Sequence, residues 1–212
     1  MRILLERRAS IVAARECPRR VRGKPGVVQW RPIKEAPVFL PATDADVPRI
    51  AALMNHAYRG TGGGAAASWS AEQAYIAGDR TTAAFLREDI DNAPGASLLK
   101  WVETPDGPAR GCVWLEPVDE GTWYLGSLCV DPELQNGGHG RTLLAAAEAW
   151  ARERGAARVR MTVINMRDTL IAWYLRRGYA PTGATEPFPY GNDRFGTPLR
   201  DDLAFVVLEK TL

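Results

Sequence analysis

The sequence is poor in the residues that build metal centres and disulfide frameworks. Histidine occurs only twice in 212 residues, as His56 and His139, which argues against a multi-histidine metal site. The three cysteines are odd in number, and no two of them form a CxxC or CxxxC pair. This argues against a zinc site or a disulfide framework and favours a reducing compartment. We therefore expect no metal and a cytoplasmic location.

Long apolar runs are also missing. No stretch approaches the roughly 20 residues that a membrane-spanning helix needs. The early apolar cluster at residues 3–5 is too short for the apolar region of a secretory signal. We therefore expect no membrane partner. The 46% hydrophobic content and seven tryptophans, by contrast, are enough to build a core.

The net charge of +2 conceals an uneven distribution. Residues 1–36 hold ten Arg or Lys and three Glu, a net charge of +7, whereas residues 37–212 carry −5. The first segment has no sustained apolar period, so we expect a basic extension, with disorder favoured over an arm that contacts nucleic acid. The mildly acidic body gives nucleic acid little support as a partner. Residues 37–212 are expected to form the folded domain.

From residue 37 onward, strand and helix patterns follow one another. Helical spacing is clearest where Val47, Ile50, Leu53, Met54 and Ala57 recur on one face. The order of elements predicts an α/β (α+β) fold with a mixed central sheet of about six to seven strands flanked by about four helices. Strands are expected at 36–43, 96–104, 109–118, 121–131, 157–163, 179–185 and 202–212, and helical stretches at 44–58, 71–78, 82–93, 141–155 and 168–178.

Three glycines stand where an apolar strand meets a helix, in the stretch DPELQNGGHGRTLL at residues 131–144. Glycine at such a junction indicates close approach of a ligand to the backbone, and a helix N-terminus attracts negative charge. The stretch lacks the Gly-Lys-Ser/Thr of a P-loop, and GHGRTL lacks the last glycine of the dinucleotide motif. Two interpretations of the residues remain, a diphosphate site or a connection without a ligand.

The hexad QNGGHG at residues 135–140 resembles the Q/R-x-x-G-x-G/A motif of the GNAT superfamily of acyl-CoA-dependent N-acyltransferases. A second motif agrees with it, because Tyr174, Gly178 and Tyr179 resemble the late Y-x-x-x-G-F/Y pattern of that family. The order of elements over residues 37–210 is also similar to that of the family. The resemblance implies the GNAT fold and acetyl-CoA as cosubstrate.

The resemblance also implies a set of CoA contacts. Amides of the glycine loop would hold the pyrophosphate at a helix N-terminus, and the preceding strand would pair with the pantetheine arm. The chain departs from the family at Arg167, where many members have an asparagine that contacts CoA, so that role is not transferred. The expected CoA-binding residues are Leu128, Cys129, Val130, Gln135, Asn136, Gly137, Gly138, His139, Gly140 and Arg141.

Tyr174 is the expected general acid, because the family tyrosine at its position commonly protonates the departing CoA thiolate. Glu116 is the expected general base. Strand alternation places Cys112, Trp114 and Glu116 on one face, and apolar neighbours raise the pKa of a carboxyl group towards the useful range. Three alternatives to Glu116 stay open, namely Asp119, Glu120 and a chain of bound water. An acyl-enzyme on Cys129 is not expected, since no histidine is placed beside it.

The long loop at residues 186–202 is the expected wall of the acceptor site. Its Tyr190, Arg194 and Phe195 are the expected substrate-binding residues, and an arginine there would favour an acceptor that bears a carboxylate. Asp193, Asp201 and Asp202, however, would favour a polyamine or a lysine. The predicted function is transfer of an acetyl group to a primary amine of a small molecule or peptide, by direct attack in a ternary complex. A sensor that binds acyl-CoA without turnover is the alternative, and a homodimer is left open.

Overall fold

The computed structural model describes residues 38–60, 72–134 and 136–212. The predicted extension, residues 1–36, and Gln135 therefore lie outside the described part. The described elements are β1 (Val38–Pro41), α1 (Val47–Arg59), β2 (Ile76–Ala77), α2 (Ala83–Asn92), β3 (Ser97–Val102), β4 (Gly111–Asp119), β5 (Thr122–Val130), α3 (His139–Glu153), β6 (Arg158–Ile164), α4 (Asp168–Leu175), β7 (Ala180–Pro187), β8 (Thr197–Pro198) and β9 (Ala204–Thr211).

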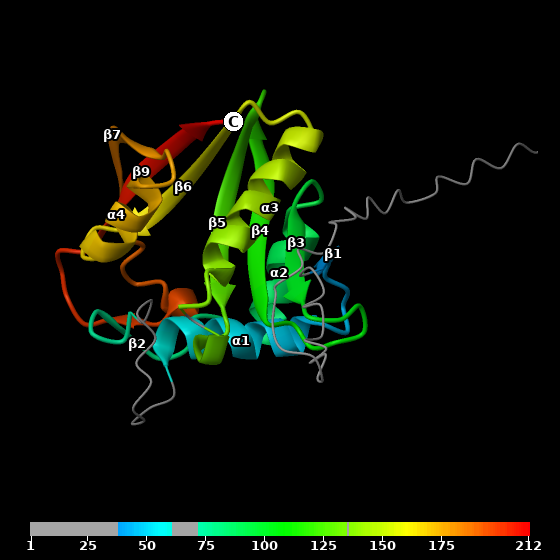
Figure 1. The fold of residues 1–212 in the computed structure, drawn as a ribbon. Coiled ribbons are helices and arrows are strands. Elements are labelled where there is room, and N and C mark those ends of the chain that lie inside the picture. Colours follow the sequence, from blue (N-terminus) through cyan, green and yellow to red (C-terminus); the bar gives the residue numbers. More distant parts are fainter. Residues whose placement is uncertain (1–37, 61–71, 135) are drawn as a thin grey trace, which may run out of the picture. The chain divides into compact units, whose positions relative to one another are not determined.

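The predicted mixed α/β architecture is confirmed. Seven strands form one sheet in the order β1-β3-β4-β5-β6-β9-β7. All neighbouring strands are antiparallel except β5 and β6, which are parallel (Figure 1). Helix α3 makes the crossover between these two strands, as a parallel pair requires.

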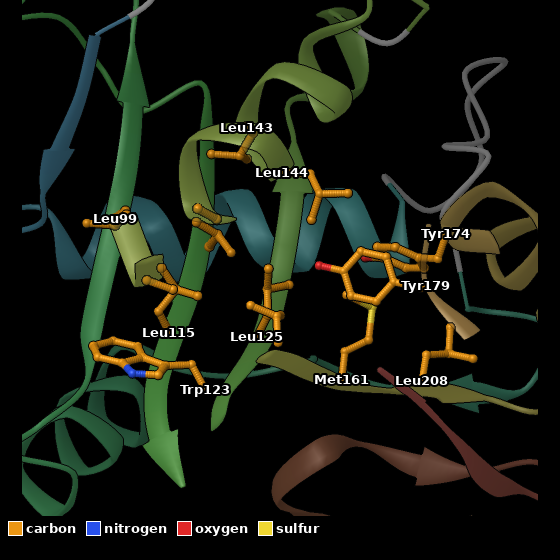
Figure 2. Close-up of a cluster of buried hydrophobic side chains, with 14 of the residues drawn as sticks. Leu99, Leu115, Trp123, Leu125, Leu143, Leu144, Met161, Tyr174, Tyr179 and Leu208 are labelled. Atoms are coloured by element: carbon orange, nitrogen blue, oxygen red, sulfur yellow. The ribbon is translucent and has the colours of Figure 1, made fainter. Parts of the chain in front are cut away.

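The two faces of the sheet are covered by different helices. Alternation along β4 sends Cys112 and Trp114 to the core under α1 and α2, and Val113 and Leu115 to the core under α3. Figure 2 shows this second core, which also takes in Tyr174 of α4. Helices α3 and α4 thus share one side of the sheet, and α1 and α2 share the other.

Strands β5 and β6 pair over a short length and then separate. Their register runs only from Thr122, opposite Arg158, to Tyr124, opposite Arg160, and Figure 1 shows the two strands diverging beyond it. A β-bulge lies in the part of β5 that has left β6. Ser127 has a φ of 50°, and together with Leu128 it stands opposite a single residue of β4.

The bulge shifts the alternation of β5 by one residue. Leu125 packs in the α3-side core before it, whereas Cys129 packs in the α1-side core after it. Unshifted alternation would have placed residue 129 on the same face as residue 125. The backbones of Ser127 and Leu128 thereby leave the β4 ladder, in the part of β5 that is no longer paired with β6.

The helix expected at residues 71–78 is wrong. In its described part, residues 72–75 form a turn and are followed by β2. Ile76 pairs with Pro198 and Ala77 with Thr197, which ties the α1–α2 connection to the long loop before β9. Gly78 adopts a φ of 78° directly after β2, so the chain turns before a helix can continue.

Helix α1 begins at Val47, three residues later than the predicted start at residue 44. Asp46 accepts hydrogen bonds from the backbone nitrogen and the hydroxyl of Thr43, both at 2.8 Å. These bonds close a turn ahead of the helix, which starts at Val47 with Pro48 in its first turn. All five apolar positions of the predicted face are buried.

Candidate active site

A cavity of about 740 Å³ opens where β5 and β6 separate. Residues from α1, the α1–α2 connection, β5, the loop before α3, β6, α4 and the long loop before β9 line it. Two groups of charged and polar lining residues face it. The α3 wall comprises Asn136, Gly138, His139, Gly140 and Arg141 with Arg176 and Arg177, and the α1 wall comprises Tyr58, Arg59, Glu72, Arg80, Arg167 and Phe195.

The glycine loop forms a left-handed turn that opens helix α3 on the cavity. Asn136 has a φ of 68° and Gly138 a φ of 80°. Gly138 is the N-cap, and its carbonyl accepts hydrogen bonds from the amides of Arg141 and Thr142. The first amides of a helix have no acceptor inside it, and those of His139 and Gly140 have none among the described residues. They can therefore donate to an anion on the α3 wall.

His139 is fixed by its own neighbours. Its ring stacks on Trp101 with centroids 4.5 Å apart. A Cβ at Gly137 would lie 2.5 Å from Nε2 of this ring, so glycine at 137 makes room for the histidine. Gly137 is the one described member of the predicted CoA set that does not line the cavity.

Three arginines give the α3 wall a positive charge. Within the described residues, no carboxylate forms an ion pair with Arg141, Arg176 or Arg177. Burial lowers the pKa of Arg177, and the positive charges of Arg176 and Arg141 lower it further. Its guanidinium carbon lies 3.4 Å from the ring centroid of Trp173. Because the three positive charges repel one another, an anion bound between them would stabilise all three.

The bulged end of β5 forms the wall that joins these two groups. Leu128, Cys129 and Val130 all line the cavity, and the hydroxyl of Tyr58 donates to the carbonyl of Leu128 at 3.2 Å. The thiol of Cys129 is buried, with its Sγ 3.3 Å from Sγ of Cys112. Among the described residues, no histidine is hydrogen-bonded to this thiol, so the structure gives it no activating base.

Tyr174 of α4 is buried and lines the cavity. Its ring makes edge contacts with Trp173 and Tyr179. Burial raises the pKa of Tyr174 well above its ordinary value, and the charge of Arg167 offsets part of that rise. Tyr179, the other tyrosine of the motif, instead donates its hydroxyl to Glu148 at 3.1 Å and does not line the cavity.

A buried ion network that sequence reasoning missed forms the α1 wall. Glu72 lies between two arginines, with Oε2 2.8 Å from Nη1 of Arg59 and Oε1 3.0 Å from Nη1 of Arg167. Beside it, the guanidinium of Arg80 lies 5.6 Å from the ring centroid of Tyr58 and 5.2 Å from that of Phe195. The single sequence signal was Arg167, which replaces the usual asparagine of the family.

The remaining predicted residues lie outside the cavity lining. Glu116 accepts a hydrogen bond from Trp114 Nε1 at 3.1 Å, and Tyr190 accepts one from the amide of Leu203 at 2.7 Å. Arg194 is bound to α2 through Glu88. Of the three residues predicted to bind substrate, Phe195 lines the cavity.

A family model matches this chain in sequence, and solved structures match it in fold. The sequence model of the acetyltransferase (GNAT) family matches residues 65–179. No curated protein matches the sequence significantly. Among solved structures, Ard1 from Thermoplasma volcanium is 15% identical with a TM-score of 0.60, and 84% of this chain and 98% of that chain are covered. The ribosomal-protein-alanine N-acetyltransferase from Brucella melitensis is 21% identical with a TM-score of 0.59, with 82% and 99% covered.

A third similar structure is the ribosomal-protein-S18-alanine N-acetyltransferase from Escherichia coli, at 16% identity and a TM-score of 0.57, with 83% and 94% covered. At these identities the structures support the fold alone. The family match and the fold define the chain as an acyltransferase. The chain belongs to the acetyltransferase (GNAT) family, since the family match spans more than half of it.

The described residues also bear on membrane and metal partners. Within residues 38–60, 72–134 and 136–212, no helix is long and apolar enough to span a bilayer. The same part of the chain holds no group of three or more His, Cys, Asp or Glu side chains that could hold a metal ion.

GNAT acetyltransferases use acetyl-CoA as their cosubstrate and act on amine acceptors.

Proposed function

We propose that this enzyme transfers an acetyl group from acetyl-CoA to a primary amine of a small molecule or peptide, by direct attack within a ternary complex. One observation carries the proposal, which is that the N-terminus of α3 and the side chain of Tyr174 line the same cavity. Acetyl transfer needs a place for the CoA diphosphate and a proton donor for the thiolate, and this cavity brings both together.

The α3 wall supports binding of the CoA diphosphate. Its helix amides and its three arginines offer hydrogen bonds and positive charge to the phosphates. Gly138 adopts a left-handed conformation and has no side chain of its own, so a ligand can approach its backbone closely. Residues 128–130 of the bulged strand lie on the cavity wall, where they would pair with the pantetheine amides.

The reaction then requires two proton transfers. The amine nitrogen attacks the thioester carbonyl carbon, the C–S bond breaks, and the sulfur leaves as a thiolate. Tyr174 donates its phenolic proton to the sulfur. Burial raises the pKa of this phenol, so it is protonated at neutral pH, as an acid must be.

The group that accepts the proton from the amine stays a prediction. Glu116 does not line the cavity, so it would act through a chain of water. Glu72 lines the cavity, but each of its carboxylate oxygens is already bonded to an arginine. Glu186 of β7 lines the cavity and forms no ion pair with any described residue, so it is a second candidate.

Calorimetric binding of acetyl-CoA tests the proposal on the wild type and on two variants. Gly138→Glu places a carboxylate on the α3 wall, where a Cβ would lie 3.8 Å from Nη2 of Arg141. Gly155→Glu is the matched control, because Gly155 has a φ of 91° and a Cβ added there would meet nothing within 4 Å. The two substitutions impose similar backbone strain, but only the first lies in the cavity.

We expect the wild type and Gly155→Glu to bind acetyl-CoA alike and Gly138→Glu to bind at least about tenfold more weakly. Circular dichroism would establish that each protein is folded. A colorimetric thiol assay with a panel of primary amines then measures turnover. A folded wild type that fails to bind acetyl-CoA would overturn the proposal, and binding without thiol release from any amine would contradict the enzymatic part of it.

A further inference from the structure

The buried network of the α1 wall has unequal charge. Arg59, Glu72 and Arg167 have side-chain exposures of 8%, 9% and 4%, respectively. Two guanidinium groups therefore share one carboxylate, and among the described residues no second carboxylate pairs with either of them. One positive charge is thus left without a partner in this part of the chain. A buried charge is costly unless an opposite charge or a full set of hydrogen bonds accompanies it.

The two arginines differ in how many of their donors are used. Arg59 donates through Nε to Gly78, through Nη1 to Glu72 and through Nη2 to Phe195. Arg167 donates through Nη1 to Glu72, whereas its buried Nη2 has no partner in the described part of the chain. The unused donor of this network therefore belongs to Arg167, which lines the cavity.

A second cation without a carboxylate lies on the same wall. Arg80 has no ion-pair partner among the described residues, and its guanidinium lies against the rings of Tyr58 and Phe195. Cation–π contacts hold a guanidinium in place without neutralising it. Arg167 and Arg80 thus present two positive charges to the cavity, and the one carboxylate between the arginines, Glu72, is already shared.

We propose that the acceptor is a small primary amine that carries its own carboxylate, which Arg167 binds with Arg80 as the second cation. A guanidinium is suited to this group because its planar N–H fork matches a carboxylate. The α3 wall has three arginines of its own for the phosphates of CoA. Arg167 and Arg80 on the α1 wall are therefore left for a different anion. The inference rests on the proposed acetyl transfer and adds the chemical class of the acceptor.

The position of Arg167 relative to the reacting atoms supports this assignment. Arg167 is the N-cap of α4, the helix that carries Tyr174, and both residues line the cavity. A carboxylate bound by Arg167 would therefore lie on the same side of the cavity as the proposed proton donor. A cavity of about 740 Å³ must also hold the pantetheine arm. The acceptor is therefore a compact amino acid in which the amine and the carboxylate are separated by a few bonds.

Matched pairs of amines test the proposal on the full chain. Glycine, β-alanine, γ-aminobutyrate and a set of L-amino acids are each compared with the corresponding carboxamide, at saturating acetyl-CoA. The two members of a pair share the amine and the approximate shape and differ in the anionic charge. For at least one pair, we expect kcat/KM of the wild type to be about 100-fold or more higher for the carboxylate, because the amide leaves the buried cation unmatched.

Two variants assign that preference to a residue. Arg167→Gln leaves Arg59 and Glu72 as a one-to-one pair, so the fold should persist, which circular dichroism checks. We expect it to reduce the carboxylate-to-amide ratio to within about tenfold of unity, and Arg80→Gln to reduce it less. Arg160→Gln is the control, because Arg160 pairs with Glu209 outside the cavity lining, and it should keep the wild-type ratio.

Three outcomes would overturn the inference. The first is a wild type with equal kcat/KM for the carboxylate and the carboxamide of every pair. The second is an Arg167→Gln variant that loses both activities equally, which would indicate that Arg167 acts on the thioester. The third is a CoA-saturated wild type that binds none of the carboxylates in calorimetry. Failure of the proposed function is distinguishable from all three, because acetyl-CoA would then fail to bind or no amine of either kind would release CoA.

Discussion

Nη1 of Arg194 lies 2.7 Å from Oε2 of Glu88, so the long loop before β9 is tied to α2. The same guanidinium donates to the carbonyl of Phe85 and to Asp89. Sequence reasoning placed Arg194 at the acceptor, where it would bind a carboxylate of the substrate. In the structure, that guanidinium is instead bonded to the enzyme's own carboxylates, those of Glu88 and Asp89.

Removal of this tether should weaken the fold modestly. We expect Arg194→Ala to lower the free energy of unfolding by about 1 kcal/mol, because the partners are partly exposed and each such pair contributes little. Urea unfolding measures the change. Arg200→Ala in the same loop removes a pair with the exposed Asp202 and should leave the midpoint unchanged. Equal effects of the two substitutions would show that the α2 contact has no special weight.

Tyr174→Phe should remove the proton donor and leave CoA binding intact. We expect kcat to fall on the order of 100-fold or more, the usual contribution of general acid catalysis, while the calorimetric affinity for acetyl-CoA stays within about twofold. In the wild type, ionisation of Tyr174 should not reduce kcat below about pH 10, because burial raises its pKa. A variant that keeps the wild-type kcat would exclude Tyr174 as the acid.

The buried phenols of Tyr174 and Tyr179 should make the fold less stable at alkaline pH. Burial raises the pKa of Tyr174 and of Tyr179, and the nearby carboxylate of Glu148 raises that of Tyr179 further. Above the unfolded value of about 10, the unfolded chain releases these protons and the folded chain keeps them, so stability falls as pH rises. We expect Tm to drop between about pH 9 and 11, and to drop less in Tyr174→Phe. Parallel profiles of wild type and variant would contradict this.

Two glutamate-to-glutamine substitutions should identify the general base. If Glu186 accepts the proton, Glu186→Gln should lower kcat about 100-fold. Glu116→Gln should then change kcat less than about threefold. The opposite result would assign the base to Glu116 acting through water. Similar small losses in both variants would indicate a base outside these two carboxylates.

Arg176 should contribute to CoA affinity through its charge. We expect Arg176→Gln to weaken acetyl-CoA binding about tenfold at low ionic strength, with a smaller loss at high salt because salt screens the interaction. Calorimetry at two salt concentrations measures this. Arg152→Gln, an exposed position at the other end of α3, is the control and should bind like the wild type. A loss that does not depend on salt would point to a structural effect.

Much of the fold and of the α3 wall could be predicted because the relevant signals are local. Apolar residues recur at helical spacing along α1 and alternate along β4, and these periods alone determine which face is buried. The glycine at 138 stands at the junction of a strand and a helix, where a left-handed turn and free amides follow from the sequence of a few residues. Tyr174 was found by the same kind of short motif.

The α1 wall could not be predicted in this way. Arg59, Glu72, Arg80 and Arg167 come from the end of α1, from the connection after it and from the start of α4, and no spacing along the chain links them. The helix predicted at residues 71–78 failed for a related reason. Pairing of β2 with β8 decides that conformation, and β8 lies about 120 residues further along the chain.

The sequence alone therefore determined the family, most of the order of the elements and the turn that opens α3, because each depends on contacts between near neighbours in the chain. Only the tertiary structure decided which arginine faces the cavity. Arg194 is neutralised by Glu88, whereas Arg167 keeps an unused donor beside a carboxylate that it shares with Arg59. Charge compensation depends on which side chains meet in space, and residues far apart in the sequence meet only in the folded chain.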